Sequence, residues 1–247
     1  QLDFPCIIES VLVEKGDGLE AAARKARYLA LDNVAKKHGA VAVLLGHTKD
    51  DQAETVLLGL ARGSGARSLS GMASVNGIYI RPFLEISRKE TEAACQELGL
   101  QPWQDPHNDD PKFKRVRVRK NVLPILEREL GPGISDALTR SAQLLRDDAD
   151  ALEQLARAFW EQDQSLEINS LLKLSKAVRT RVLRIALLQA IKDSSVNAGE
   201  NKGSAQLSSE QVGQVEALVS NWKGQGEVSL PAGVKVSRIS GRLTLSI

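Results

Sequence analysis

Residues 45–72 read LGHTKDDQAETVLLGLARGSGARSLSGM, and this stretch decides the fold that we expect for the chain. An apolar run over residues 41–45 precedes it; the run is too short for a helix and is bounded by glycines, which predicts a buried parallel strand. From Asp50 the apolar residues recur at helical spacing, which predicts a helix over residues 50–61. His47 and the first helical turn therefore lie at the carboxyl end of a strand, where open α/β sheets bind ligands.

Three carboxylates gather in the first turns of this predicted helix. Asp50 and Glu54, or Asp51 and Glu54, are spaced so that they share one helix face. Such a pair suits Mg²⁺, which takes one or two carboxylates and completes its shell with phosphate oxygens and water. The alternative is that the acids only stabilise the positive end of the helix dipole. Both interpretations stay open from spacing alone.

A glycine-rich loop follows the same helix. Gly63 and Gly65 allow the backbone to approach a phosphate closely, and Arg62 offers a positive charge to neutralise it. Two glycines after a helix are also an ordinary C-terminal cap, so the loop by itself is weak evidence for a phosphate site.

The first half of the chain alternates between strand-like and helical segments. This alternation predicts an α/β domain with a parallel sheet in three layers, and Ser87 with Glu90 predicts a capping box at one helix start. After Gly99 the alternation stops, and residues 101–111 form a loop rich in Pro, Asp and Asn. The expected segments are a strand over 6–13, a helix over 19–37, strands over 41–45 and 78–83, and helices over 50–61 and 87–98.

A basic segment comes next, with six cations in nine residues and no acid before Glu127. Such a segment can follow a phosphate backbone, although a solvated helix face is the alternative. Residues 115–119 alternate as in a strand; if they are instead helical, Arg115 and Arg119 share one face and Arg117 points elsewhere. The six cations are Lys112, Lys114, Arg115, Arg117, Arg119 and Lys120.

The second half of the chain is mainly helical by pattern. Helical spacing begins at Val118, Pro124 is expected to kink or restart that helix, and Ser135 is expected to cap a long one. A further helix is expected over residues 177–191. Residues 194–205 show no periodicity and predict a disordered loop. Alternation over residues 228–230, 234–237 and 243–246 predicts a small terminal β-hairpin or meander.

Composition restricts the class of protein. Hydrophobic residues make up 42% and charged residues 26% of the 247 residues, with a net charge of +2, which is ordinary for a globular protein. Cys6 and Cys95 are too few and too far apart for a disulfide framework or a metal cluster, which favours a reducing, cytoplasmic setting. No apolar run approaches the ~20 residues that a membrane-spanning helix needs.

Two blocks of sequence resemble the tRNA(Ile)-lysidine synthetases, a family of PP-loop ATP pyrophosphatases. Residues 46–55 follow the family pattern G-H-H-x-D-D-Q-A-E-T, and R-G-S-G at 62–65 and G-M at 71–72 also match. Residues 105–119 follow the pattern D-P-S-N-x-D-x-x-x-x-R-N-x-[IV]-R. Thr48, His107 and Val116 depart from these patterns, at positions where the family usually has histidine, serine and asparagine.

This resemblance implies a fold and a reaction. We expect a Rossmann-like, adenine nucleotide α-hydrolase-like PP-loop domain over residues 1–110, and a mainly helical domain that binds tRNA over residues 111–247. The resemblance also favours helix over strand at residues 115–119. The implied ligase joins L-lysine to the wobble cytidine of tRNA(Ile) with a CAU anticodon, using ATP with Mg²⁺ and releasing AMP and pyrophosphate. A homodimer and the absence of a membrane partner are further expectations.

The resemblance also assigns roles to residues. The expected catalytic residues are Asp50, Asp51, Glu54, Arg115 and Arg119, with Asp51 and Glu54 as the Mg²⁺ ligands. The expected contacts to ATP or substrate are His47, Arg62, Gly63, Ser64 and Gly65, and those to tRNA are Lys112, Lys114 and Arg117, with Asp105 and Asn108 ordering their loop.

One departure concerns the pyrophosphate loop. PP-loop enzymes carry an S-G-G-x-D-S run after their first strand, and this sequence contains none. We therefore expect the sequence to be a fragment without that strand and loop, inactive by itself. A tRNA-thiolating PP-loop enzyme is an alternative, which two isolated cysteines disfavour. A catalytically silent tRNA-binding remnant is the alternative from another class.

Overall fold

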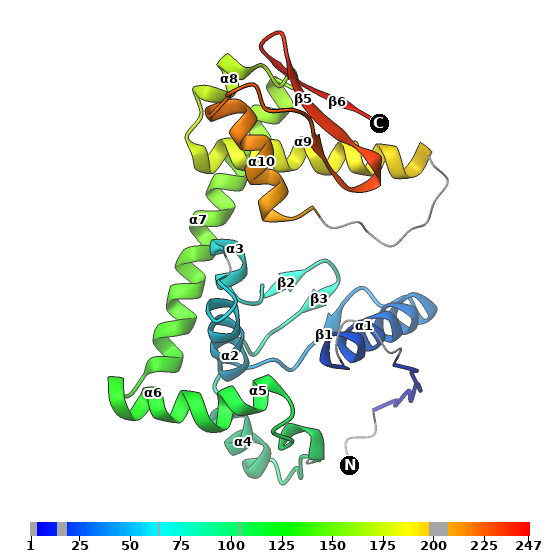
Figure 1. The fold of residues 1–247 in the computed structure, drawn as a ribbon. Helices are drawn as coiled ribbons and strands as arrows, with labels where there is room; N and C mark the ends of the chain where they lie inside the picture. Colours follow the sequence, from blue (N-terminus) through cyan, green and yellow to red (C-terminus); the bar gives the residue numbers. More distant parts are fainter. Residues whose placement is uncertain (1–3, 14–18, 64, 104, 198–206) are drawn as a thin grey trace. The chain divides into compact units, whose positions relative to one another are not determined.

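A computed structural model describes the chain as two compact units, residues 1–146 and 147–247. The division lies beyond residue 110, where the sequence placed the domain boundary, because the basic segment after that residue packs against a helix of the first unit. Figure 1 shows the helices and strands of both units. The described residues are 4–13, 19–63, 65–103, 105–197 and 207–247.

Unit 1 has a small sheet with helices around it, so the expectation of an α/β fold is confirmed. Strand β1 pairs in parallel with β3, Val43 opposite Tyr79 and Leu44 opposite Ile80. Strand β2 is antiparallel to β3, so the sheet is mixed and not wholly parallel. The elements of residues 19–97 are α1 (Leu19–His38), β1 (Val43–Leu44), α2 (Lys49–Leu60), α3 (Ala66–Leu69), β2 (Val75–Asn76), β3 (Tyr79–Ile80) and α4 (Arg88–Glu97).

The strands are shorter and more exposed than the sequence predicted. The parallel strand expected over residues 41–45 is present only as Val43–Leu44, and its expected burial is wrong, since Val41 is 93% and Leu44 69% exposed. The expected strand over 78–83 keeps only its first part, since β3 ends at Ile80. Residues 6–13 form no strand, and Ile8 and Leu12 are 89% and 95% exposed. A strand needs a partner for its backbone groups, and no described residue pairs with this run.

Helix α4 begins as predicted. The Ser87 backbone N–H donates to Glu90 Oε2 at 2.7 Å, and the Glu90 N–H donates to Ser87 Oγ at 3.2 Å. These reciprocal bonds satisfy two N–H groups at the start of the helix, which confirms the capping box.

The basic segment is helical, as the resemblance favoured. A short α-turn leads into a π-helical turn, in which the Leu123 N–H bonds to Val118 O, and a second α-helix begins there with Pro124 in its first turn. Pro124 has no N–H to donate, so the helix restarts at this point, as predicted. The elements are η1 (Pro106–Asn108), α5 (Lys114–Arg117), the π-turn η2 (Val118–Val122), α6 (Leu123–Leu130) and the long α7 (Ile134–Gln162).

The start of α7 is capped by a residue that the sequence did not suggest. The Glu127 carboxylate accepts from the N–H of Gly133 at 2.6 Å and from that of Ser135 at 3.0 Å. The expectation that Ser135 caps this helix is therefore wrong, because Ser135 lies inside the first turn and a carboxylate from α6 takes the free N–H groups.

Unit 2 has an apolar core between helices and a β-meander. Leu171, Leu183, Leu187 and Leu218 are at most 1% exposed there. The strands β4, β5 and β6 pair antiparallel in that order, which confirms the terminal meander. The elements are α8 (Ile168–Leu172), α9 (Lys176–Asn197), α10 (Ser209–Ser220), β4 (Val228–Ser229), η3 (Pro231–Gly233), β5 (Lys235–Ile239) and β6 (Arg242–Ser246).

The end of α9 corrects one expectation. The helix continues to Asn197, so residues 194–197 are helical where the sequence predicted a loop; Ser194 is buried and donates its hydroxyl to Ala232 O at 2.8 Å. Residues 198–205 of that predicted loop lie outside the described residues.

A buried ion pair joins α9 to α10 inside unit 2. Arg179 and Glu216 are 9% and 8% exposed at their side chains, and Arg179 Nη2 and Nε both donate to Glu216 Oε1, at 2.5 and 3.0 Å. Arg179 Nη1 donates to Leu174 O at 3.0 Å, and the Ser220 hydroxyl donates to Glu216 Oε2 at 3.1 Å. The oxygens of the carboxylate and all three nitrogens of the guanidinium therefore have partners.

Candidate active site

The first turn of α2 holds Asp51 beside the end of β1. Thr48 precedes the helix, and both its N–H and its hydroxyl donate to Asp51 Oδ2, at 2.9 and 3.0 Å. Asp51 is 9% exposed. These two bonds fix the carboxylate, so its other oxygen, Oδ1, is presented in a defined direction.

Glu54 lies one turn further along α2 and binds Arg119 of η2 with both carboxylate oxygens. Arg119 Nε donates to Glu54 Oε1 at 2.6 Å, and Arg119 Nη2 donates to Oε2 at 3.1 Å. The Glu54 side chain is fully buried. Burial raises the pKa of the Glu54 carboxyl above its usual value, against the opposing effect of the Arg119 guanidinium.

Three guanidinium groups surround the second oxygen of Asp51, which accepts a hydrogen bond from Arg119 Nη2. Arg88 Nη2, Arg115 Nη1 and Arg119 Nη2 lie 3.6, 3.8 and 3.4 Å from Asp51 Oδ1. Arg115 also donates from Nη2 to the Thr55 hydroxyl at 3.0 Å. Arg115 and Arg119 thus share a face, as the sequence predicted, whereas Arg88 of α4 was missed because only the fold brings α4 to α2. We call Asp51, Glu54, Arg88, Arg115 and Arg119 the acid–arginine cluster.

Asp50 lies next to the cluster but has a different partner. Its Oδ2 accepts the backbone N–H of Arg88 at 2.6 Å, which ties the start of α4 to α2. Of the three predicted acids, Asp51 and Glu54 therefore hold arginine side chains, whereas Asp50 holds the start of α4.

The predicted Mg²⁺ pair does not fit this arrangement. Both oxygens of Glu54 already accept from Arg119, and Asp51 Oδ1 faces three cations. Among the described residues, no group of three His, Cys, Asp or Glu side chains could hold a metal ion. The excess of positive charge suits a phosphate group instead, since guanidinium groups bind phosphate oxygens well.

His47 lies beside the cluster, close enough to Asp51 and Arg115 for their charges to affect its pKa. Burial lowers the pKa of His47 from 6.5 to about 4, with Asp51 opposing this and Arg81 and Arg115 adding to it. The imidazole is therefore neutral at pH 7. His47 Nδ1, Arg81 Nε and Arg88 Nε are buried and have no hydrogen-bond partner in the described part of the chain. Buried polar atoms are normally paired, so these three point to a ligand with polar groups.

A side-chain clamp holds α2 in place. Gln52 Nε2 donates to Met72 O at 2.9 Å, and the Met72 N–H donates to Gln52 Oε1 at 2.6 Å. Gly71 has φ +63°, and a Cβ there would lie 2.5 Å from Gln52 Oε1, which explains the glycine. Arg146 of α7 donates to the carbonyls of Ser70 and Gly71 at 2.5 and 3.0 Å. The Gly71–Met72 pair of the motif is thus structural.

The glycine-rich loop lies at the other end of α2. Arg62 lies eleven positions after Asp51 in the sequence, about 16 Å at the helical rise per residue. Gly63 has φ +65°, and a Cβ at Gly63 or Gly65 would meet nothing within 4 Å. Ser64 lies outside the described residues. The structure does not bring this loop beside the acids, so its predicted ligand contact stays a prediction.

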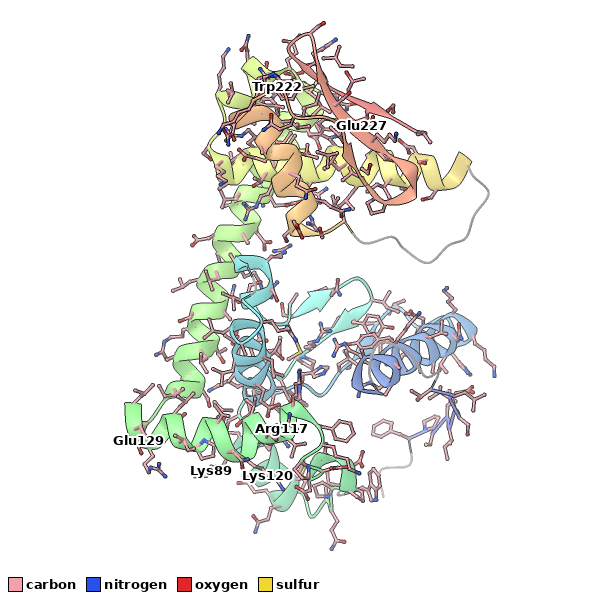
Figure 2. The ribbon with its side chains drawn as sticks, in the orientation of Figure 1. Lys89, Arg117, Lys120, Glu129, Trp222 and Glu227 are labelled. Atoms are coloured by element: carbon pink, nitrogen blue, oxygen red, sulfur yellow. The ribbon has the colours of Figure 1, made fainter. Side chains whose placement is uncertain are left out.

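The predicted tRNA-binding cations lie on the exposed side of the basic segment. Lys112, Lys114 and Arg117 are exposed, and Arg117 Nη1 donates to the carbonyls of Pro111 and Lys112 at 2.6 and 3.0 Å. Figure 2 labels Arg117 and Lys120 on this segment. The two predicted loop residues, Asp105 and Asn108, are joined across η1, where the Asn108 N–H donates to Asp105 O at 2.9 Å.

Comparison with known proteins adds two matching families. A family model described as PP-loop domain matches residues 1–126, and one described as TilS substrate binding domain matches residues 166–244. Among the described residues, no helix combines the length and the apolar character needed to cross a bilayer.

Curated relatives align over nearly the whole chain. The tRNA(Ile)-lysidine synthase of Streptomyces coelicolor is 49% identical over 98% of this chain and 68% of its own length. That of Thermobifida fusca is 49% identical over 96% of this chain and 71% of its length. That of Mycobacterium tuberculosis is 45% identical over 98% of this chain and 73% of its length.

Proposed function

This chain belongs to the tRNA(Ile)-lysidine synthase family, and from that premise we propose that its acid–arginine cluster serves the joining of L-lysine to a tRNA cytidine. The substrate is tRNA(Ile) with a CAU anticodon, and the modified base is its wobble cytidine. ATP supplies the activating group and leaves as AMP and pyrophosphate. The observation that carries the proposal is the two-point binding of Arg119 by Glu54.

The reaction proceeds in two displacements. In the first, cytosine O2 attacks the α-phosphorus of ATP, an O–P bond forms, and pyrophosphate leaves. In the second, the ε-amine of lysine attacks C2 of the base, the C–O bond to AMP breaks, and the amine proton is released. Negative charge grows on the α-phosphate oxygens in the first step, and positioned guanidinium groups stabilise such charge.

The acids keep the arginines in position for this charge. An arginine that is already held needs no reorganisation when the phosphate charge develops. Glu54 fixes Arg119 by two hydrogen bonds, and the Thr55 hydroxyl fixes Arg115 by one. We propose that Arg88, Arg115 and Arg119 present their remaining donors to the α-phosphate, while Asp51 keeps the three cations together.

Two further groups are assigned to the other reactants. Neutral His47 has an unused Nδ1, which we propose contacts a polar group of the nucleotide or the cytosine. The lysine amine must be neutral to attack, so its proton needs an acceptor. We propose Asp50 for this role, because only its Oδ2 has a partner and its Oδ1 is unused among the described residues.

Several finer assignments stay proposals that further measurements can test. Exposed Lys112 and Lys114 are proposed to contact the tRNA backbone, as is Arg117. Any Mg²⁺ is proposed to arrive on the phosphates of ATP and not on Glu54. The loop at Arg62 and Gly65 is proposed to contact tRNA at a distance from the cluster, and a homodimer is proposed for solution.

Sulfur transfer finds no support in the structure. Cys6 is exposed and Cys95 is partly buried, and they lie in separate segments as free thiols. The relatives are named lysidine synthases, which favours lysine as the group transferred.

The test removes the carboxylate at the centre of the cluster. Asp51→Ala frees Arg88, Arg115 and Arg119 from their shared acid, and we expect AMP formation to fall about 100- to 1000-fold. Binding of tRNA should stay within a few-fold, because phosphate contacts elsewhere are kept. AMP release is measured with ATP, lysine and tRNA, using protein expressed with any residues that the gene encodes upstream of Gln1.

The matched control is Asp109→Ala, which removes an exposed acid that pairs with Lys120 outside the cluster. That variant should keep its turnover. If Asp51→Ala kept a turnover within a few-fold of wild type, the acids would have no role in the reaction and would only stabilise the start of the helix through its dipole. Tight tRNA binding by a wild-type protein that forms no AMP would identify a silent binder.

A further inference from the structure

The loop that follows α10 in unit 2 presents a tryptophan at the surface. Trp222 is 40% exposed, and Figure 2 labels it on this loop, which no part of the proposed reaction uses. The loop lies within the residues matched to the substrate binding domain. A large aromatic side chain left partly in water is a frequent anchor of binding surfaces.

The backbone on both sides of Trp222 is held by one side chain. Gln225 Nε2 donates to Asn221 O at 2.6 Å, and the Lys223 N–H donates to Gln225 Oε1 at 2.6 Å. The residue before Trp222 and the residue after it are therefore tied to the same amide group. The exposed ring is presented by an ordered loop, so binding to it carries a small cost in conformational entropy.

The ring itself is held by Arg238 of β5. The Arg238 guanidinium carbon lies 5.3 Å from the centroid of the Trp222 ring, within the range of a cation–π contact. Arg238 Nη1 donates to Leu218 O at 2.9 Å and to Val219 O at 3.4 Å, at the carboxyl end of α10. These bonds fix the guanidinium beside the ring.

Two cations, Arg238 over the ring and Lys223 next to Trp222 in the sequence, have donors without a protein partner among the described residues. Arg238 Nε and Nη2 have no protein partner in the described part of the chain, and neither has the Lys223 ammonium. The nearby Lys235 differs, since it pairs with Glu227 at 2.6 Å. An aromatic face with unused cationic donors beside it matches the two parts of a nucleotide, a flat base and a phosphate.

We infer that Trp222, Lys223 and Arg238 form a binding site for one unpaired nucleotide of the tRNA. The base stacks on the exposed part of the Trp222 ring, and Arg238 and Lys223 bind the adjoining phosphate. An unpaired nucleotide is required because bases inside a duplex already stack on one another and present no free face. The inference rests on the proposed function, and it adds a tRNA contact within unit 2.

The first experiment compares tRNA affinity among variants of this loop. Trp222→Ala should weaken binding about 5- to 150-fold, the range for one lost stacked base. Trp222→Tyr keeps an aromatic face and should restore most of the affinity, which a purely structural defect would not allow. Ile239→Ala is the matched control, because it removes a 55%-exposed apolar side chain from β5 in the same unit.

The second experiment separates the stack from the phosphate contact. Arg238→Gln should lower the slope of log affinity against log salt by about one, whereas Trp222→Ala should leave the slope unchanged. A fully paired RNA duplex of the same length as the tRNA offers no unpaired base to stack on the ring, so Trp222→Ala should bind it with the same affinity as wild type does. Circular dichroism melting of each variant shows whether unit 2 is still folded.

The outcomes distinguish this inference from the proposed function. Wild-type affinity for tRNA in Trp222→Ala, or an equal loss in Ile239→Ala, would overturn the nucleotide site and leave the proposed function standing. An equal loss on duplex RNA would overturn it too. A wild-type protein that binds no tRNA would instead overturn the proposed function.

Discussion

Unit 1 and unit 2 each hold an arginine against a buried glutamate, and the two pairs are completed differently. In unit 2, Arg179 and Glu216 are both at least nine-tenths buried, and the three guanidinium nitrogens and both carboxylate oxygens have protein partners. In unit 1, Arg119 is 22% exposed, two more arginines crowd the same acids, and Arg88 Nε is left without a partner.

The difference teaches how the same chemistry serves two purposes. A buried pair whose nitrogens and oxygens all have protein partners holds elements together and leaves no unpartnered atom for a ligand. A cluster with more cations than its acids can neutralise costs stability and is ready for an anion. Unused donors, and not the presence of an ion pair, therefore indicate the candidate site.

The largest effect that tests this comparison is on stability. Glu216→Gln leaves the Arg179 charge buried and unpaired, and we expect a loss of about 3–5 kcal/mol in the free energy of unfolding. Glu54→Gln should cost roughly half of that or less, because Arg119 is partly exposed and keeps Asp51 at 3.4 Å. Urea unfolding followed by tryptophan fluorescence and circular dichroism measures both. Equal losses would remove the distinction between the two pairs.

A second test disturbs the contact between Gln52 and the Gly71–Met72 pair, which holds α2 and with it the acid–arginine cluster. Gly71→Ala adds a Cβ 2.5 Å from Gln52 Oε1 at a residue with φ +63°. We expect a cost of about 1–3 kcal/mol beyond that of Gly63→Ala, which has the same backbone conformation but open space. Unfolding free energies of both variants, and of Gly71→Ala combined with Gln52→Ala, measure this. If Gly63→Ala costs as much as Gly71→Ala, backbone strain alone explains the glycines.

The smallest effect concerns the charge of His47. Its pKa is lowered from 6.5 to about 4 by folding, so the neutral ring contributes stability that is fully present above pH 6.5 and is lost as pH falls toward 4. Wild type should lose more stability between pH 7 and pH 4.5 than His47→Gln does. Unfolding at the two pH values measures the difference, and an NMR titration of the ring gives the pKa directly. Identical losses in the two proteins would mean that His47 titrates normally.

Much of unit 1 follows from local sequence. The capping box at Ser87 and the helices α1, α2 and α4 were predictable because their signals lie within a few residues of one another. The shared face of Arg115 and Arg119 was also predictable, since it follows from helical spacing. These are properties of a short segment, so no partner has to be known.

What the sequence did not reveal depends on residues far apart in the chain. Spacing placed Asp51 and Glu54 on one face and suggested Mg²⁺, but it gave no sign that Arg119, 65 residues after Glu54, would occupy both oxygens of Glu54. Burial of Val41 and Leu44 was inferred from their apolar character, although burial depends on which elements cover them. The site proposed at Trp222 has no signature in the sequence, because its members belong to no motif and Arg238 meets Trp222 only through the packing of α10 on β5.

The π-turn at residues 118–122 determines the direction in which the side chains of α6 point around the helix axis. This turn contains one residue more than an α-helical turn would, and a single residue corresponds to about 100° of rotation around a helix axis. Removing one residue from this turn would rotate Glu127 by about 100° relative to Arg119 and swing it away from the start of α7. The extra residue of the π-turn thus lets the run from α5 to α6 aim Arg119 at α2 and Glu127 at the start of α7.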